Sequence, residues 1–176
     1  MKSENEVKNR IIGVAAVTAL LSSSAFAGER FISAGYANLD SDGVSTNGIG
    51  FGWHMKFGET IKQAVGIEYF LSEESNDIND SKGNAINAHY DLGYEFWPNT
   101  TLYGSIGYGA QSIESYVNSA GQKKDVMAAG MSIGAGLYYS LNNTFDINAS
   151  YKQYKLGILD LDYTLNITNI SLAYKY

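Results

Sequence analysis

Hydrophobic and polar residues alternate with a period of two along most of the chain after residue 46. In the segment 127–139, for example, Met127 and Met131 share one parity, while Gly130 and Ser132 share the other. Strict alternation places the two sets on opposite faces of a β-strand. No convincing helical period is found between residues 46 and 176, so the sequence predicts an all-β protein.

Eight segments carry this alternation, and most are longer than a typical strand of a soluble protein. They lie at about 29–39, 48–57, 63–71, 86–96, 102–110, 127–139, 145–151 and 169–176. A tilted strand needs about 9–11 residues to cross the hydrocarbon layer of a membrane. We therefore predict eight membrane-crossing strands.

The phase of the alternation is least regular in the first and last strands. In the first strand we place Ile32, Ala34 and Tyr36 on the outward face. In the last strand the apolar residues change from odd to even positions near 163–168. This change predicts either a β-bulge or the true start of the strand.

Short and long connections alternate along the chain. Turn-like connections are expected at 58–60, 98–100 and 140–143, and Pro98 stands where its missing N–H breaks no ladder bond. Longer polar connections are expected at 40–46, 73–84, 114–125 and 156–164. Bacterial outer-membrane barrels have short periplasmic turns and longer outer loops, and an even number of strands leaves both chain ends in the periplasm.

One face of the predicted strands carries charges of both signs. We expect its side chains to form a polar network in a narrow lumen, with the members His54, Lys56, Lys62, Glu68, His89, Asp91, Glu95, Asp146 and Lys152. The opposite face carries no charge in the central part of these strands, as a lipid-facing surface requires. A soluble ligand-binding barrel also has alternating strands, but its interior is usually apolar. The charge distribution therefore favours an all-β, eight-stranded antiparallel up-and-down transmembrane β-barrel.

Aromatic residues on the uncharged face cluster near the strand ends. We expect them to form a girdle at the periplasmic membrane surface, with the members Trp53, Phe57, Tyr94, Phe96, Tyr139, Phe145, Tyr174 and Tyr176. Closure into a barrel is required, because an open sheet would leave unpaired backbone groups in lipid.

Residues 1–27 have the features of a secretory signal peptide. A basic start is followed by the apolar stretch 11–21, which is too short to span a bilayer as a helix. Ala25 and Ala27 occupy the small-residue positions of a cleavage site. We expect cleavage after Ala27, a barrel domain over residues 28–176, and a location in the outer membrane of a Gram-negative cell.

The end of the chain shows the alternation most simply, as Ile170, Leu172, Tyr174 and Tyr176. With the strand pattern described above, this ending resembles the small OmpA/OmpX-type family of eight-stranded outer-membrane barrels. The resemblance implies that the last strand is recognised by the barrel-assembly machinery, although Tyr176 stands where the family usually has Phe. It also implies outer-membrane lipid and lipopolysaccharide as partners.

Acidic residues dominate the predicted long connections. They contain ten acids and three bases, whereas the whole chain after residue 27 has 16 acids and 9 bases. Such a surface should repel nucleic acids and other polyanions. It could share divalent cations with lipopolysaccharide phosphates, which is a hypothesis.

The resemblance implies a structural or surface-interaction role in membrane integrity, adhesion or resistance to host factors, and not an enzyme. A lipid-modifying enzyme is one alternative, but it would need a nucleophile and a base together, and His89 and Asp91 point into the lumen with no serine at a recognisable spacing. A narrow channel or a small-ligand site is the other, although side chains can fill an eight-stranded barrel. With no cysteine and no zinc spacing, we expect neither a cofactor nor a metal.

Overall fold

The computed structural model describes residues 28–41, 44–59, 61–72, 83–117, 123–158 and 161–176. It contains eight strands: β1 Glu29–Ser41, β2 Val44–Phe57, β3 Ile61–Ser72, β4 Gly83–Trp97, β5 Thr100–Val117, β6 Lys123–Ser140, β7 Phe145–Ile158 and β8 Leu161–Lys175. In these residues there is no helix that is long and apolar enough to cross a membrane.

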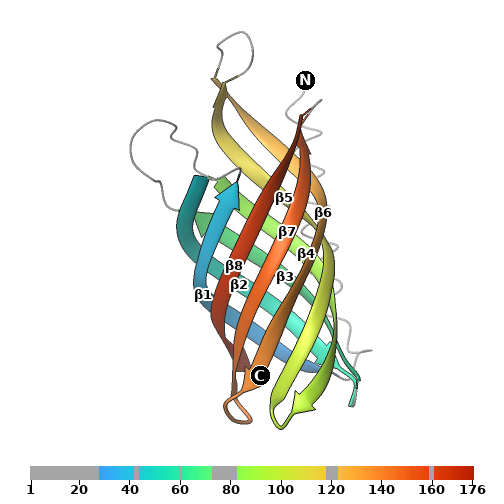
Figure 1. Cartoon of the computed structure of the whole chain (residues 1–176). Helices are drawn as coiled ribbons and strands as arrows, with labels where there is room; N and C mark the ends of the chain where they lie inside the picture. The colour runs from blue at the N-terminus through green and yellow to red at the C-terminus, as the bar shows by residue number, and fades with distance from the viewer. Residues whose placement is uncertain (1–27, 42–43, 60, 73–82, 118–122, 159–160) are drawn as a thin grey trace, which may run out of the picture.

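The eight strands close into one antiparallel barrel, in which each strand pairs with its neighbours in the sequence. Closure is made by β1 and β8, which pair from Phe31 with Lys175 to Ser41 with Leu165. The predicted fold class is therefore confirmed. Figure 1 shows the two tight turns and the C-terminus together at one end of the barrel, which we call the turn end. The opposite end is called the outer end.

Two residues with a positive φ lie in the tight connections at the turn end. Asn99 has a φ of 65° in the β4–β5 turn, and Gly58 has a φ of 91° after β2. Both values lie in the left-handed region, which glycine and asparagine adopt at the lowest cost. A register shift between Glu95 and Trp97 precedes the first of these turns.

The expected long outer connections are mostly wrong. The segments 40–46 and 156–164 are largely strand: Asp40 pairs with Ser45 across β1 and β2, and Leu156 pairs with Tyr163 across β7 and β8. β5 and β6 likewise extend over much of 114–125. A strand can continue beyond the membrane, where its outward side chains face solvent and are therefore polar. In the remaining predicted connection, 73–84, residues 73–82 lie outside the described residues.

Both alternatives predicted near 163–168, a bulge and the start of the last strand, are also wrong, because β8 begins at Leu161 and pairs continuously with β7 from Leu161 to Tyr174. The change in pattern has another cause. Leu165 and Ile167 are each 1% exposed and face the interior, whereas Thr168 on the other face is exposed. The chain keeps its pairing, and the polarity of its two faces inverts.

Apolar side chains fill the interior toward the outer end. They form one buried cluster of Ala37, Leu39, Phe70, Ala85, Ala128, Tyr154, Leu156, Leu165 and Ile167. We call this the outer plug. Toward the turn end the interior becomes polar, which places the candidate site in that half.

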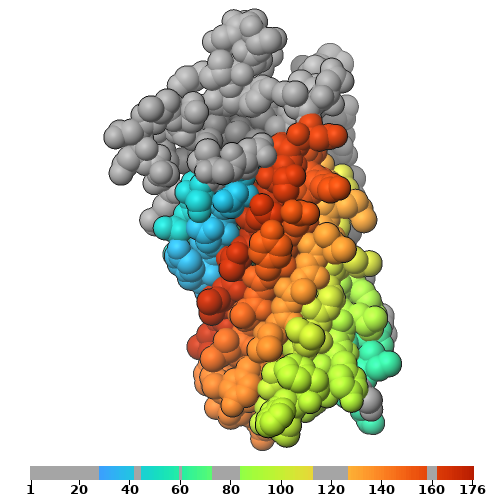
Figure 2. Space-filling view, in the orientation of Figure 1, coloured from blue at the N-terminus to red at the C-terminus, as the bar shows by residue number. Residues whose placement is uncertain are grey.

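The outside of the barrel carries an apolar band. Ile32 and Tyr36 are 51% and 55% exposed, so the predicted outward phase of β1 is correct. Phe31, which has the opposite parity, is buried. In Figure 2, β8, β7 and β6 run obliquely side by side across the visible face. Above Tyr36 the outward residues become polar, and Asn38 Nδ2 donates to Ser45 Oγ at 2.7 Å and to Asn47 Oδ1 at 3.1 Å.

Candidate functional site

The centre of the lumen holds a buried ion pair between Glu68 of β3 and Lys152 of β7. Their side chains are 3% and 2% exposed. Asn87 Nδ2 donates to Glu68 Oε2 at 3.4 Å, and Ser132 Oγ donates to Asn87 Oδ1 at 3.2 Å. His89 Nδ1 lies 3.6 Å from Glu68 Oε2. With the neighbouring His54, the cluster contains residues of β2, β3, β4, β6 and β7. It therefore links opposite walls of the barrel.

Two imidazole rings lie beside the ion pair. The rings of His54 and His89 are 5.3 Å apart between centroids, and His54 Nε2 lies 3.3 Å from Ser33 Oγ. His54 Nδ1 and His89 Nε2 have no hydrogen-bond partner among the described residues. Gly66 leaves the space into which both rings reach, because a Cβ there would lie within 2.7 Å of each ring.

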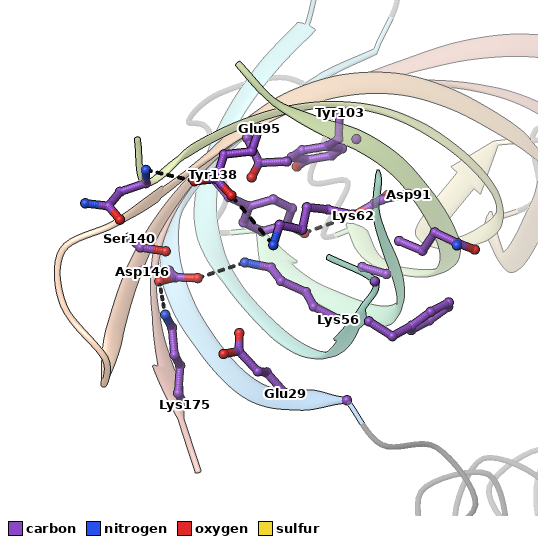
Figure 3. Close-up of a pocket in the computed structure, with 18 of the residues that line it drawn as sticks. Glu29, Lys56, Lys62, Asp91, Glu95, Tyr103, Tyr138, Ser140, Asp146 and Lys175 are labelled. Atoms are coloured by element: carbon purple, nitrogen blue, oxygen red, sulfur yellow. Dashed lines mark hydrogen bonds and ion pairs between the residues drawn. The ribbon is translucent and has the colours of Figure 1, made fainter. Parts of the chain in front are cut away.

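A second ion cluster lies toward the turn end (Figure 3). Asp146 Oδ2 is 2.8 Å from Lys56 Nζ, and its Oδ1 is 2.8 Å from Lys175 Nζ. The Lys56 ammonium also lies 3.6 Å from the ring centroid of Tyr138 and 4.2 Å from that of Phe31. These contacts combine charge attraction with cation–π interaction.

A cavity of about 850 Å³ lies at the turn end, and we call it the vestibule. Its walls include the turn residues Glu59 and Asn99 and the lumenal residues Asp91, Tyr103 and Tyr138. The rings of Tyr103 and Tyr138 stack with centroids 4.5 Å apart. Small residues on β3 and β4, such as Ala64 and Gly93, leave the space open.

The structure divides the nine predicted lumenal residues into groups. His54, Glu68, His89, Asp91 and Lys152 lie in or beside the central cluster, and Lys56 and Asp146 form the second cluster. Lys62 and Glu95 pair with each other at 3.6 Å, with side chains 32% and 40% exposed. That last pair lies at the rim of the vestibule and not in the buried interior.

Several lumenal residues were not predicted as part of the site. Tyr138 donates to Asp91 Oδ2 at 3.0 Å, and Tyr103 donates to Asn148 Oδ1 at 2.8 Å. Both tyrosines have the inward parity of their strands, so parity alone could have identified them. Lys175 has the same inward parity in the last strand.

The aromatic residues predicted as a girdle lie near the turn end, on the outside. Tyr94, Phe96, Tyr139, Tyr174 and Tyr176 are exposed by 59%, 52%, 43%, 43% and 62%. Trp53, Phe57 and Phe145 are half-buried, and Trp53 Nε1 donates to the Tyr176 hydroxyl at 3.0 Å. Their place at a membrane surface stays a prediction. Ala25 and Ala27 lie outside the described residues.

The site offers little for metal or nucleophilic chemistry. Within the described ranges, no group of three His, Asp or Glu side chains is arranged to hold a metal ion. Ser33 contacts His54, as a nucleophile and base would, but His54 Nδ1 has no carboxylate partner among the described residues. A catalytic triad needs such a partner to orient the base.

Comparison with known proteins agrees with a closed barrel that has a lipid-facing exterior. Residues 13–176 match the family described as outer membrane protein beta-barrel domain. The chain belongs to this family. It is therefore an outer-membrane β-barrel, and by the rule for such barrels its short turns face the periplasm. Among curated protein sequences, none matches the chain.

Solved structures share the fold of this outer-membrane barrel. Ail, the attachment invasion locus protein of Yersinia pestis, in complex with the heparin analogue sucrose octasulfate, is 23% identical, with a TM-score of 0.62 over 86% of this chain and 100% of Ail. Neisserial surface protein A is 14% identical, with a TM-score of 0.57 over 88% of this chain and 100% of that protein. OprG of Pseudomonas aeruginosa is 13% identical, with a TM-score of 0.51 over 85% and 96% of the two chains.

Proposed function

We propose that this outer-membrane barrel is a surface-interaction protein that binds its partners through its outer end. The observation that carries the proposal is the inversion of polarity toward that end. There the interior is the apolar outer plug, and the outward side chains are polar. The outer end therefore has the construction of a small soluble barrel, which can hold binding segments rigidly above the membrane.

Hydrogen bonds between outward side chains support this proposal. The Tyr151 hydroxyl and Gln153 Nε2 both donate to Asn166 Oδ1, at 3.0 and 3.2 Å. Together with the Asn38 bonds, they join β7 to β8 and β1 to β2 above the apolar band. An ordered polar surface at this height is suited to contact with lipopolysaccharide headgroups or with ligands outside the cell.

The names of two related structures point in the same direction, since one is an attachment protein and the other a surface protein. The ligand seen on Ail is a polysulfate, and the acidic outer segments of this chain do not favour such a ligand. We therefore infer a cationic or uncharged partner, or one bridged by divalent cations. Membrane integrity and resistance to host factors remain within the same proposal.

A channel is less well supported, because a cluster of buried apolar side chains, the outer plug, lies in the outer half of the lumen. Phe70, Leu156 and Leu165 in this plug are each 1% exposed. A lipid-modifying enzyme is also less well supported, because the lumenal His89 and Asp91 are 6% and 2% exposed and lie inside the barrel. Lipid chains on the outside do not reach them.

The proposal is tested by replacing residues 73–82 with a short Gly-Ser linker. Cells that produce this variant should lose adhesion to host-cell matrix or serum components, while the barrel keeps its heat-modifiable mobility in detergent gels. A matched control replaces Asn142 and Asn143 with glycine at the turn end, and this variant should adhere like the parent. Unchanged adhesion of the variant that lacks residues 73–82, or no adhesion by the parent, would contradict the proposal.

A further inference from the structure

The junction between β1 and β8 differs from the other junctions of the barrel. Every other pair of neighbouring strands is consecutive in the sequence, so a chain connection joins one end of each pair. We call the β1–β8 junction the seam. Toward the turn end its pairing runs to Phe31 and Lys175, and beyond them Tyr176 N donates to Arg30 O at 3.1 Å. Strand ends that no turn joins open most easily, so side-chain contacts matter most here.

On the outside of the barrel, a hydrogen bond crosses β1 at the turn end of the seam. Trp53 Nε1 of β2 donates to the Tyr176 hydroxyl at 3.0 Å. Trp53 pairs with Ile32 on one side of β1, and Tyr176 bonds to the backbone of Arg30 on the other side. Strand β1 therefore lies between the two side chains, and their bond joins β2 to the residue that follows β8.

On the inside, an ion cluster crosses the seam at the same end. Asp146 of β7 contacts Lys56 of β2 and Lys175 of β8, each at 2.8 Å (Figure 3). Because the strand order is β2, β1, β8, β7, the contact between Lys56 and Asp146 spans both strands of the seam. The ring centroid of Phe31 in β1 is 4.2 Å from Lys56 Nζ and 5.7 Å from Lys175 Nζ. Asp146 and Phe31 are each 1% exposed, so these contacts are shielded from bulk water, where charge attraction is weaker.

We propose that these two groups of contacts form a clamp, which takes the place of the missing turn and holds the seam shut. The outer part of the clamp is Trp53 with Tyr176, and the inner part is Lys56, Asp146 and Lys175. An open seam exposes unpaired backbone groups, which is costly within lipid, so opening has to begin at one end of the seam. The clamp closes the turn end. It lies at the opposite end of the barrel from the surface of the proposed function, so either inference can fail alone.

The outer part of the clamp is tested by the rate at which the barrel unfolds in urea from lipid vesicles. Trp53→Phe and Tyr176→Phe should each raise the unfolding rate by about two- to tenfold, because each removes the same hydrogen bond. The double variant should unfold no faster than the faster of the two single variants. Tyr139→Phe, the matched control, removes another exposed hydroxyl at the turn end and should unfold like the parent.

The inner part is tested with Lys56→Met, which breaks the link from β2 to β7 and leaves Asp146 paired with Lys175. Hydrogen exchange in the same vesicles should become about tenfold faster at the seam amides 31–33 and 173–175, and it should stay unchanged in the β4–β5 hairpin. Lys62→Met is the matched control and should change neither region. If Lys56→Met does not fold, exchange in Tyr176→Phe decides, because this change removes a single oxygen atom and should still speed exchange at the same amides.

The clamp requires both parts, so failure of either one would overturn the proposal. The failing results are unchanged unfolding rates in the two aromatic variants, additive effects in their double variant, and unchanged exchange at the seam amides. A uniform rise of exchange throughout the barrel would also overturn it, because the contacts would then stabilise the whole barrel and not the seam.

Discussion

Lys152 of β7 forms an ion pair with Glu68 of β3 across the lumen, although these two strands share no backbone hydrogen bonds. The pair therefore joins opposite walls of the barrel. Both side chains are almost fully buried, so neither charge can be solvated by bulk water if its partner is removed. This arrangement makes the two residues strongly coupled in their effect on stability.

We expect Lys152→Met or Glu68→Leu alone to lower the free energy of unfolding by about 3–5 kcal/mol, because each leaves a buried charge without a partner. The double variant should recover most of this loss. Urea unfolding in lipid vesicles measures both effects. Lys62→Met, which removes a half-exposed pair with Glu95, should change stability by less than about 1 kcal/mol. Additive losses in the double variant would show that the ion pair is not the cause.

The apolar band predicts different responses to a charge at two positions on one face of β8. Leu172 is 50% exposed and belongs to the apolar band, so Leu172→Lys should destabilise the barrel by about 2–4 kcal/mol. Thr164 has the same outward parity near the outer end, and Thr164→Lys should have little effect. Folding titrations in vesicles distinguish the two variants. Equal losses would mean that the band extends to Thr164.

Two glycines on opposite faces of the barrel should respond differently to alanine. A Cβ at Gly66 would lie 2.6 Å from His54 Nδ1 and 2.7 Å from the His89 ring, so Gly66→Ala should cost about 1–3 kcal/mol of stability. At Gly104 a Cβ would meet nothing within 4 Å, and Gly104→Ala should be neutral or stabilise by about 0.4–1 kcal/mol. Thermal unfolding in detergent measures both. A neutral Gly66→Ala would mean that the two histidines can move apart.

The acidic outer segments predict that sucrose octasulfate, the ligand present in the Ail complex, binds this barrel poorly. Calorimetric titration at physiological salt should give no saturable signal with the parent. The double variant Asp40→Lys and Asp162→Lys reverses two charges near the outer end and should gain measurable, salt-dependent binding. Saturable binding by the parent would contradict the assigned charge of the outer surface.

Alternation predicted the strand number and the outward faces, because a lipid-facing surface requires apolar residues at every second position. Closure followed from the need to pair every backbone group in lipid. The parity rule also separates inward from outward residues at most positions, and it holds for Glu68, Asp91 and Lys152. Pairing across the lumen is not visible in this way. Nothing in the spacing of Glu68 and Lys152 shows that they meet, because their contact depends on barrel closure and tilt.

The sequence was misleading where the surrounding solvent changes along one strand. Leu39, Leu165 and Ile167 are apolar and face inward, whereas the charged face of the strands predicted a polar interior along the whole barrel. Polar residues such as Asp40 and Thr164 were assigned to loops, because a polar outward face was taken as the end of a strand. Beyond the membrane, the inward positions of a strand are apolar and its outward positions are polar, which is the reverse of the pattern within the membrane.

The inversion of β8 between Thr168 and Ile170 divides the molecule into two parts with separate requirements. Below it the outer face must remain acceptable to lipid, whereas above it the barrel is held together by its own apolar plug. Changes in the exposed segments at the outer end therefore need not disturb insertion into the membrane. A protein built this way can vary its extracellular surface widely while the membrane part remains constant.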